Sequence, residues 1–112
     1  MIEVRVPIKT INGLNERAHW SDKAKRAKAE RHAVGWALSC TDRPALPCLV
    51  LITREGMNRR LMDGDGLQSA AKHVRDAVAD WLGVDDSDRR ITWAYDQTPN
   101  TPYAVRIRVK AE

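Results

Sequence analysis

Apolar and polar residues follow one another along this chain in patterns that predict four strands. Residues 2–8 carry an apolar side chain at every even position, as a half-buried strand does. Residues 48–54 are almost continuously apolar, which favours a central strand covered on both faces. Residues 90–96 and 103–110 predict two further strands. The stretch 97–102, which contains two prolines, predicts a hairpin loop joining them.

Two other stretches repeat apolar residues at the three- and four-residue spacing of a helix. The first covers residues 22–39, with Ser21 in position to act as its N-cap. The second covers residues 66–82 and has the stronger apolar face. Asp65 is a suitable N-cap for this helix. Gly83, directly after residue 82, predicts where the helix ends.

The expected order of elements, β-α-β-α-β-β, describes an α+β (mixed α/β) domain with a mixed four-stranded sheet and two helices. A length of 112 residues fits one domain, residues 1–112. We expect no association with membranes, because no apolar run could span a bilayer and the start resembles a strand rather than a signal peptide. Cys40 and Cys48 lack metal-ligand spacing, so we interpret them as reduced residues of a cytoplasmic protein; a disulfide is the less favoured alternative.

Charge is distributed unevenly along the chain. The formal net charge is +4, yet residues 1–62 hold 12 Lys and Arg against 6 Asp and Glu, whereas residues 63–112 hold 7 against 9. Seven aspartates fall within residues 63–88. A basic surface suits a polyanion such as DNA. A concentrated acidic segment within a basic protein suits a divalent cation.

Many of the basic residues gather on the first predicted helix. A run of charges is commonly a solvated helix face. Because only Asp22 and Glu30 oppose five cations on this helix, we favour a face that contacts phosphates. The five residues are Lys23, Lys25, Arg26, Lys28 and Arg31.

Two aspartate clusters flank the second predicted helix. Asp63 and Asp65 are two residues apart and can converge on one hard cation, although a helix-capping loop is the simpler explanation of this spacing taken alone. An EF-hand is excluded, because its glycine and glutamate are missing from the required positions. Asp85 and Asp86 follow the same helix and, taken alone, would form a solvated acidic turn.

Over nearly its whole length the chain resembles the RusA family of Holliday junction resolvases. That family has an Asp-x-Asp-Asn motif opening a helix, an Asp-Asp pair after the helix and two closing strands, and residues 59–95 are similar. Its phage-type branch has a helix end VRDAVADxLGVDD followed by RITW, as at residues 74–86 and 90–93. The loop LNERAHW at residues 14–20 resembles the LNxRxHW of the same branch.

This resemblance implies a magnesium-dependent endodeoxyribonuclease that resolves four-way DNA junctions in recombination and repair, with Mn²⁺ as an alternative cation. Asp63, Asp65 and Asp86, with Asp85 beside it, correspond to the metal-binding carboxylates. Lys72 corresponds to the catalytic lysine. A surface ion pair between Lys72 and Asp76, one helical turn later, is almost as good an explanation of a lysine at this position. The implied DNA contacts, besides the basic helix, are Arg59, Arg60, Asn15, Arg17 and His19.

The chain departs from the family pattern at three positions near the first cluster. Gly66 stands in place of the motif's Asn, Gly64 in place of an intervening residue that is often Asp, and Ser69 at a position often held by the lysine. These departures leave open a catalytically weakened or inactive DNA-binding dimer of the same fold. A structural domain whose charges are merely solvated is a further alternative.

The length of the second helix makes one chain insufficient for the implied site. About 17 residues, at about 1.5 Å each, separate the helix ends by roughly 25 Å. Asp63 and Asp86 of one chain therefore do not reach one ion, whereas two chains with this helix antiparallel across a two-fold axis bring them together. The resemblance also implies a homodimer with composite active sites. A partner would further enlarge the small core of so short a chain.

Overall fold

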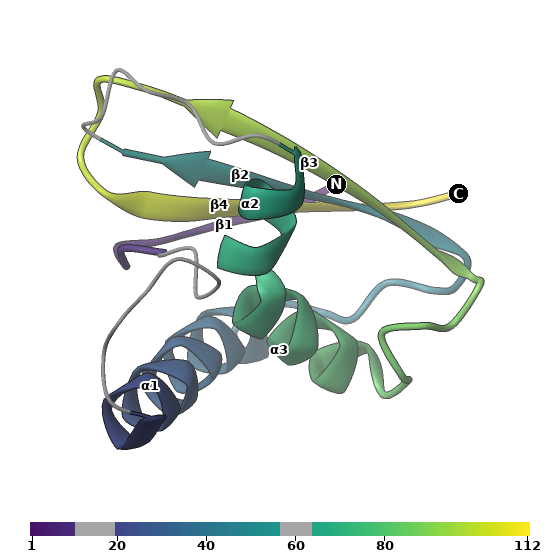
Figure 1. The fold of residues 1–112 in the computed structure, drawn as a ribbon. Coiled ribbons are helices and arrows are strands. Elements are labelled where there is room, and N and C mark those ends of the chain that lie inside the picture. Colours follow the sequence, from purple (N-terminus) through teal and green to yellow (C-terminus); the bar gives the residue numbers. More distant parts are fainter. Residues whose placement is uncertain (11–19, 57–63) are drawn as a thin grey trace.

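The structure, a computed structural model, describes residues 1–10, 20–56 and 64–112 (Figure 1). The α+β class and the mixed four-stranded sheet are confirmed, but the described residues form three helices where two were predicted. The elements in chain order are β1 (Ile2–Val6), α1 (Trp20–Ser39), β2 (Cys48–Glu55), α2 (Gly64–Ala70), α3 (Lys72–Leu82), β3 (Ile91–Thr98) and β4 (Ala104–Ala111).

The strands lie side by side in the order β1-β4-β2-β3. β4 runs antiparallel to both of its neighbours, and β2 and β3 are parallel. The predicted hairpin between β3 and β4 is therefore wrong, since β2 lies between them. β2 is the most apolar strand and gains most from neighbours on both edges. The link from β3 to β4 passes the end of β2, where Gly56 N–H donates to the Thr98 carbonyl at 3.1 Å and Thr101 N–H donates to the Gly56 carbonyl at 3.0 Å.

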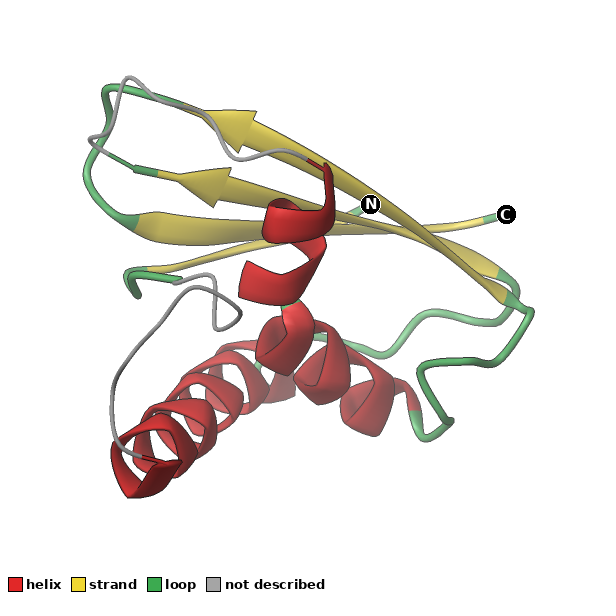
Figure 2. Cartoon of the chain, viewed as in Figure 1, coloured by secondary structure: helices red, strands yellow, loops and turns green. Residues whose placement is uncertain are grey.

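One face of the sheet packs on α1 and α3 and encloses the core (Figure 2). Alternate residues of β2 and β4 point into this layer and meet apolar side chains of the two helices. Each of these side chains is at most 1% exposed. They are Val34, Leu38, Val50, Ile52, Val74, Val78, Val105, Ile107 and Val109. The apolar side chains that recur at every second residue of the strands, and at the helical spacing of α1 and α3, all pack into this one layer.

In the described part of the chain no helix lies over the opposite face of the sheet, so the predicted cover of β2 on both faces is only partly present (Figure 2). Leu49 and Leu51 are only half-buried there. Glu55 points to this face and is nevertheless buried, because arginines of β1 and β4 cover it. Its carboxylate lies 2.9 Å from Arg5 Nε and 3.1 Å from Arg106 Nη2. Ion pairs thus replace a second helical layer.

The predicted helix over residues 66–82 is present but broken into α2 and α3 at Ala71, whose φ is −90° and ψ is 1°. Hydrogen bonds continue through the bend, because Ala71 N–H donates to the Leu67 carbonyl at 3.0 Å and Arg75 N–H donates to the Ala71 carbonyl at 2.9 Å. The bend allows α3 to pack beside α1 while α2 turns toward the sheet (Figure 1).

Both predicted N-caps are wrong, while the predicted helix end is confirmed. α1 begins at Trp20 and α2 at Gly64, so Ser21 and Asp65 lie within the first turn, where the helix dipole favours an acidic side chain such as that of Asp65. Gly83 ends α3 in the left-handed conformation, with φ 78°. Its N–H donates to the Asp80 carbonyl at 3.1 Å, as in a Schellman motif.

Both cysteines are free thiols, as predicted. Cys48 begins β2 within the core, and burial, followed by the charge of Glu112, raises the pKa of its thiol. Cys40 is exposed just after α1. No helix in the described part of the chain is long and apolar enough to cross a membrane.

The backbone at Gly83 predicts a clear stability effect. In Gly83→Ala, the positive φ and a Cβ placed 2.9 Å from Arg43 Nη1 should lower the free energy of unfolding by about 1 kcal/mol, mostly through the backbone because the arginine can move. Gly35→Ala is the matched control. It lies inside α1 with nothing within 4 Å of the added Cβ, and should raise stability by about 0.5–1 kcal/mol. Urea unfolding measures the stability of both variants. Equal stability of the two would contradict the left-handed conformation assigned to Gly83.

Candidate metal and nucleic-acid site

The predicted metal ligands that the structure describes lie at opposite ends of the α2–α3 pair. Asp65 is exposed in the first turn of α2, and Asp85 and Asp86 lie in the loop after α3. The helices have 7 and 11 residues, so at about 1.5 Å per residue they measure about 10 and 16 Å. Even a right-angle bend would leave the two ends roughly 20 Å apart. The bend therefore does not bring the two clusters of one chain together (Figure 1).

Asp86 is held in place by side chains from α3 and β3. Arg75 Nε donates to Asp86 Oδ2 at 3.0 Å, and Arg75 Nη2 donates to the Asp86 carbonyl at 3.0 Å. Trp93 Nε1 donates to the same carbonyl at 3.0 Å. These three bonds fix both the carboxylate and the backbone of this residue. We call Arg75, Trp93 and Tyr95 the Asp86 clamp.

Arg75 is the centre of the clamp. Its Nη1 donates to the Tyr95 hydroxyl at 3.0 Å, and its guanidinium carbon lies 4.6 Å from the centre of the Trp93 ring. Burial acts to lower the pKa of Arg75, but the hydrogen bond and charge of Tyr95, with those of Asp86, outweigh it and raise the pKa. The guanidinium therefore stays charged opposite the carboxylate of Asp86.

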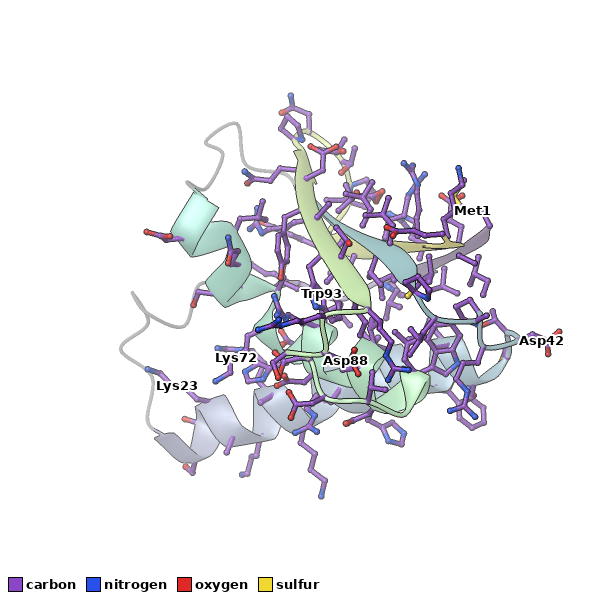
Figure 3. The ribbon with its side chains drawn as sticks, turned by 90° about the vertical axis from the view of Figure 1, so that its right-hand side faces the viewer. Met1, Lys23, Asp42, Lys72, Asp88 and Trp93 are labelled. Atoms are coloured by element: carbon purple, nitrogen blue, oxygen red, sulfur yellow. The ribbon has the colours of Figure 1, made fainter. Side chains whose placement is uncertain are left out.

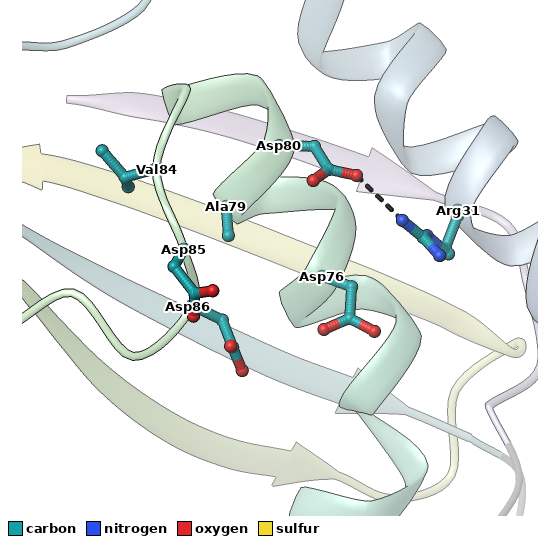
Figure 4. Close-up of a pocket in the computed structure, with 7 residues that line it drawn as sticks. All are labelled: Arg31, Asp76, Ala79, Asp80, Val84, Asp85 and Asp86. Atoms are coloured by element: carbon teal, nitrogen blue, oxygen red, sulfur yellow. Dashed lines mark hydrogen bonds and ion pairs between the residues drawn. The ribbon is translucent and has the colours of Figure 1, made fainter.

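Asp85 and Asp86 also line a hollow of about 150 Å³ beside α3 (Figure 4). Asp76 and Asp80 of α3 contribute two further carboxylates, and Arg31 of α1 approaches from the other side, its Nη2 3.0 Å from Asp80 Oδ2. Carboxylate oxygens are the donors that Mg²⁺ prefers. Within residues 1–10, 20–56 and 64–112, however, no three His, Cys, Asp or Glu side chains are grouped so that they could hold one metal ion.

The other carboxylates of the turn are held by local hydrogen bonds. Asp85 Oδ1 accepts from the Ser87 N–H at 2.9 Å and from its hydroxyl at 2.8 Å, which lowers the pKa of Asp85. The side chain of Arg90, and then its backbone N–H, lower the pKa of Asp88 to about 2. Both groups are therefore anionic at neutral pH, the state in which a carboxylate binds a cation.

Lys72, the predicted catalytic lysine, is exposed at the start of α3 (Figure 3). The predicted cations of α1 are also described: Lys25, Lys28 and Arg31 are exposed, and Lys23 and Arg26 are half-buried. A hollow of about 500 Å³ on this helix is lined by Lys28, Arg31, His32 and two alanines. The ion pair with Asp80 engages part of the charge of Arg31. The predicted site residues outside the described part of the chain are Asn15, Arg17, His19, Arg59, Arg60 and Asp63.

The Asp86 clamp could not be predicted from the sequence. Its residues lie in or next to the segments 74–86 and 90–93, which carried the resemblance without any role assigned to them. Nothing in the helical pattern distinguishes Arg75 from a solvated surface arginine. Its role depends on the fold, which brings Arg75 of α3 within reach of Trp93 and Tyr95 of β3.

Comparison with known proteins does not assign this chain to a family. No protein-family model matches the sequence, and no curated protein matches it significantly.

The clamp should contribute measurably to stability. Arg75→Ala removes three hydrogen bonds, two of them to Asp86, and should lower the free energy of unfolding by about 2 kcal/mol. The control is Arg90→Ala. Among the described residues the Arg90 side chain pairs with its neighbour Asp88 at the surface, so its removal should change stability little. Chemical unfolding of the two variants is the measurement. A loss no larger for Arg75→Ala than for the control would mean that the clamp does not hold the turn.

Proposed function

We propose that this protein is a magnesium-dependent endodeoxyribonuclease of the RusA type that resolves four-way DNA junctions as a homodimer. The observation that carries the proposal is the position of Asp65 and of Asp85–Asp86 at opposite ends of the α2–α3 pair. Carboxylates matching the family's ligands are present, but one chain keeps them too far apart to share an ion. The basic α1 supplies the charge expected of a surface that binds a polyanion.

A two-fold dimer with antiparallel α2–α3 pairs accounts for this separation. In such a dimer the start of α2 in each copy lies next to the end of α3 in the other. Each of the two sites then takes Asp63 and Asp65 from one copy and Asp85 and Asp86 from the second. Two sites related by a two-fold axis also suit a four-way junction, which must be cut on two strands.

The proposed roles follow from the chemistry of each side chain. The four aspartates would hold Mg²⁺ (Mn²⁺ as an alternative), and a bound ion supplies activation of water and stabilisation of charge on the reacting phosphate. Lys72 adds electrostatic stabilisation to the same phosphate. Arg75 acts as a positioning residue, because it holds Asp86 from α3. The cations of α1 hold flanking phosphates and set the register of the DNA.

A DNA-binding dimer without cleavage is the second candidate. The specific observation in its favour is the ion pair of 3.0 Å between Arg75 and Asp86, since this carboxylate already has a cationic partner. Gly64, Gly66 and Ser69 point in the same direction. Binding to a four-way junction that weakens with salt but never leads to cleavage would select this candidate.

The proposal predicts magnesium-dependent cutting of a synthetic four-way junction. Asp65→Asn and Asp86→Asn should each lower cleavage by more than about 100-fold, beyond the loss usual for outer partners of a metal, because they remove anionic ligands. Junction binding should persist, since less negative charge lies near the DNA. Asp42→Asn, an exposed acid far from both clusters (Figure 3), is the control and should cut normally. Full activity of both site variants would overturn the metal assignment.

Mixed dimers of the same two variants test whether the site is shared. In a dimer of one Asp65→Asn chain and one Asp86→Asn chain, one composite site receives both lesions and the other receives none. Purified mixed dimers should therefore nick one strand when magnesium is present, whereas each parent homodimer should not. If each site drew all its ligands from one chain, every site of the mixed dimer would carry a lesion, and no nicking would be seen.

A further inference from the structure

Trp36 is a large aromatic side chain that stays exposed on α1. It is 72% exposed, whereas Trp81 and Trp93 are half-buried against the core. α1 packs on β1 and α3 through the side that carries Val34 and Leu38 (Figure 1). By helical spacing Trp36 lies on the opposite side of α1, so its indole contributes little to the core.

Basic side chains precede Trp36 along the same side of α1. Lys25, Lys28 and His32 come before it at intervals of three or four residues, which places the four residues on one side of a helix. All four side chains are exposed. With a rise of about 1.5 Å per residue, each lies about 4.5–6 Å from the next along the helix axis. We call Lys25, Lys28, His32 and Trp36 the α1 stripe.

The α1 stripe has little negative charge near it. Among the described residues, no carboxylate forms an ion pair with Lys25 or Lys28. The two acids of α1 are Asp22, in its first turn, and Glu30, which is only 4% exposed. The stripe is therefore a cationic surface that suits a polyanion, and it ends in an exposed aromatic ring.

A hollow of about 500 Å³ lies against the α1 stripe. Its lining includes Lys28 and His32 of the stripe, together with two alanines of the same helix. Because an alanine side chain is short, a ligand can approach the helix closely between the longer cations. The hollow gives room for a sugar-phosphate chain beside Lys28, and Trp36 follows roughly 12 Å further along the helix axis.

We propose that the α1 stripe binds single-stranded DNA and that Trp36 stacks on one of its bases. Aromatic rings next to cations suit an unpaired strand, since each base offers a flat face to an indole and each nucleotide offers a phosphate to a cation. In a duplex the neighbouring pairs cover the faces of each base, so a surface ring does not reach them. Lys25 and Lys28 hold the phosphates, and Trp36 receives the base.

A second copy of this chain is a poorer occupant of the α1 stripe. If the stripe lay on a two-fold axis it would meet itself, and its lysines would face the same lysines of the other copy, which weakens binding. The inference rests on the proposed function only in taking α1 as a surface for DNA. It adds the form of DNA that this surface takes and the residue that contacts a base.

Binding of a fluorescein-labelled oligothymidine, measured by anisotropy without magnesium, tests the stripe. Trp36→Ala should weaken binding about 5- to 100-fold, the range for loss of one stacked base. The salt dependence of binding should not change in this variant, because no charge is removed. Lys28→Gln should also weaken binding, and should reduce the slope against salt by about 0.7 for one lost phosphate contact.

Lys110→Gln is the matched charge control. Lys110 is an exposed lysine on the face of the sheet that no described helix covers, so it lies away from α1. This variant should bind oligothymidine like the wild type. A loss as large as that of Lys28→Gln would mean that net charge, rather than the stripe, governs binding, and would overturn the proposal.

Two further variants of Trp36 separate stacking from simple apolar contact. Trp36→Phe keeps an aromatic ring and should retain most of the binding. Trp36→Leu keeps an apolar side chain without a ring and should bind as weakly as Trp36→Ala. Each variant should melt like the wild type, because the side chain is exposed. Wild-type binding of oligothymidine by either Trp36→Leu or Trp36→Ala would overturn the proposal.

A duplex of the same length distinguishes an unpaired strand from other partners. Trp36→Ala should lose less affinity for the duplex than for oligothymidine, and an equal loss for both would overturn the proposal. Sedimentation tests the second copy as occupant. A dimer that became monomeric in Trp36→Ala would place this residue at the dimer interface and would also overturn the proposal.

A synthetic four-way junction keeps this inference separate from the proposed nuclease. A protein that binds oligothymidine through Trp36, but neither binds nor cuts the junction, would retain the α1 stripe and contradict the nuclease. Magnesium-dependent cutting of the junction by a protein whose binding of oligothymidine is unaffected by Trp36→Ala would retain the nuclease and overturn the inference.

Discussion

The domain depends on one apolar layer enclosed between a single face of the sheet and the helices α1 and α3. Val34 and Leu38 of α1 and Val74 and Val78 of α3 are completely buried against β2 and β4. Because α3 must lie on this layer, the helical segment bends at Ala71, and α2 turns toward the sheet. The same packing lets Arg75 of α3 reach Trp93 of β3 and hold the turn that carries Asp86. The arrangement of the candidate ligands is thus a consequence of how the core is buried.

The strands and the longer helix were predictable because their periodicity is local, whereas strand pairing and bending are not. The alternation in β4 identifies which side chains face the core, but it says nothing of which strands lie at the two edges. A proline-containing link therefore suggested a hairpin, although β2 separates β3 from β4. The apolar pattern runs unbroken through Ala71 because the hydrogen bonds continue there, so the bend left no trace in the sequence.

The candidate sites show the same division. Asp65, Asp85 and Asp86 could be selected from the sequence, since acidic residues stand out when they gather near both ends of one helix. The partners that hold them could not, because Arg75 resembles any polar residue on a helix surface.

The position of β4 has a consequence for biosynthesis. This strand is translated after all the others, yet it lies between β1 and β2 and joins them. A nascent chain that has emerged only as far as β3 can form the helices and pair β2 with β3, but β1 has no strand to join. Contacts such as that between Glu3 and Arg106, 103 residues apart, form only when residues 104–111 have left the ribosome. Until then the edge of β2 that pairs with β4 stays open, and an open apolar strand edge can pair with a strand of another chain.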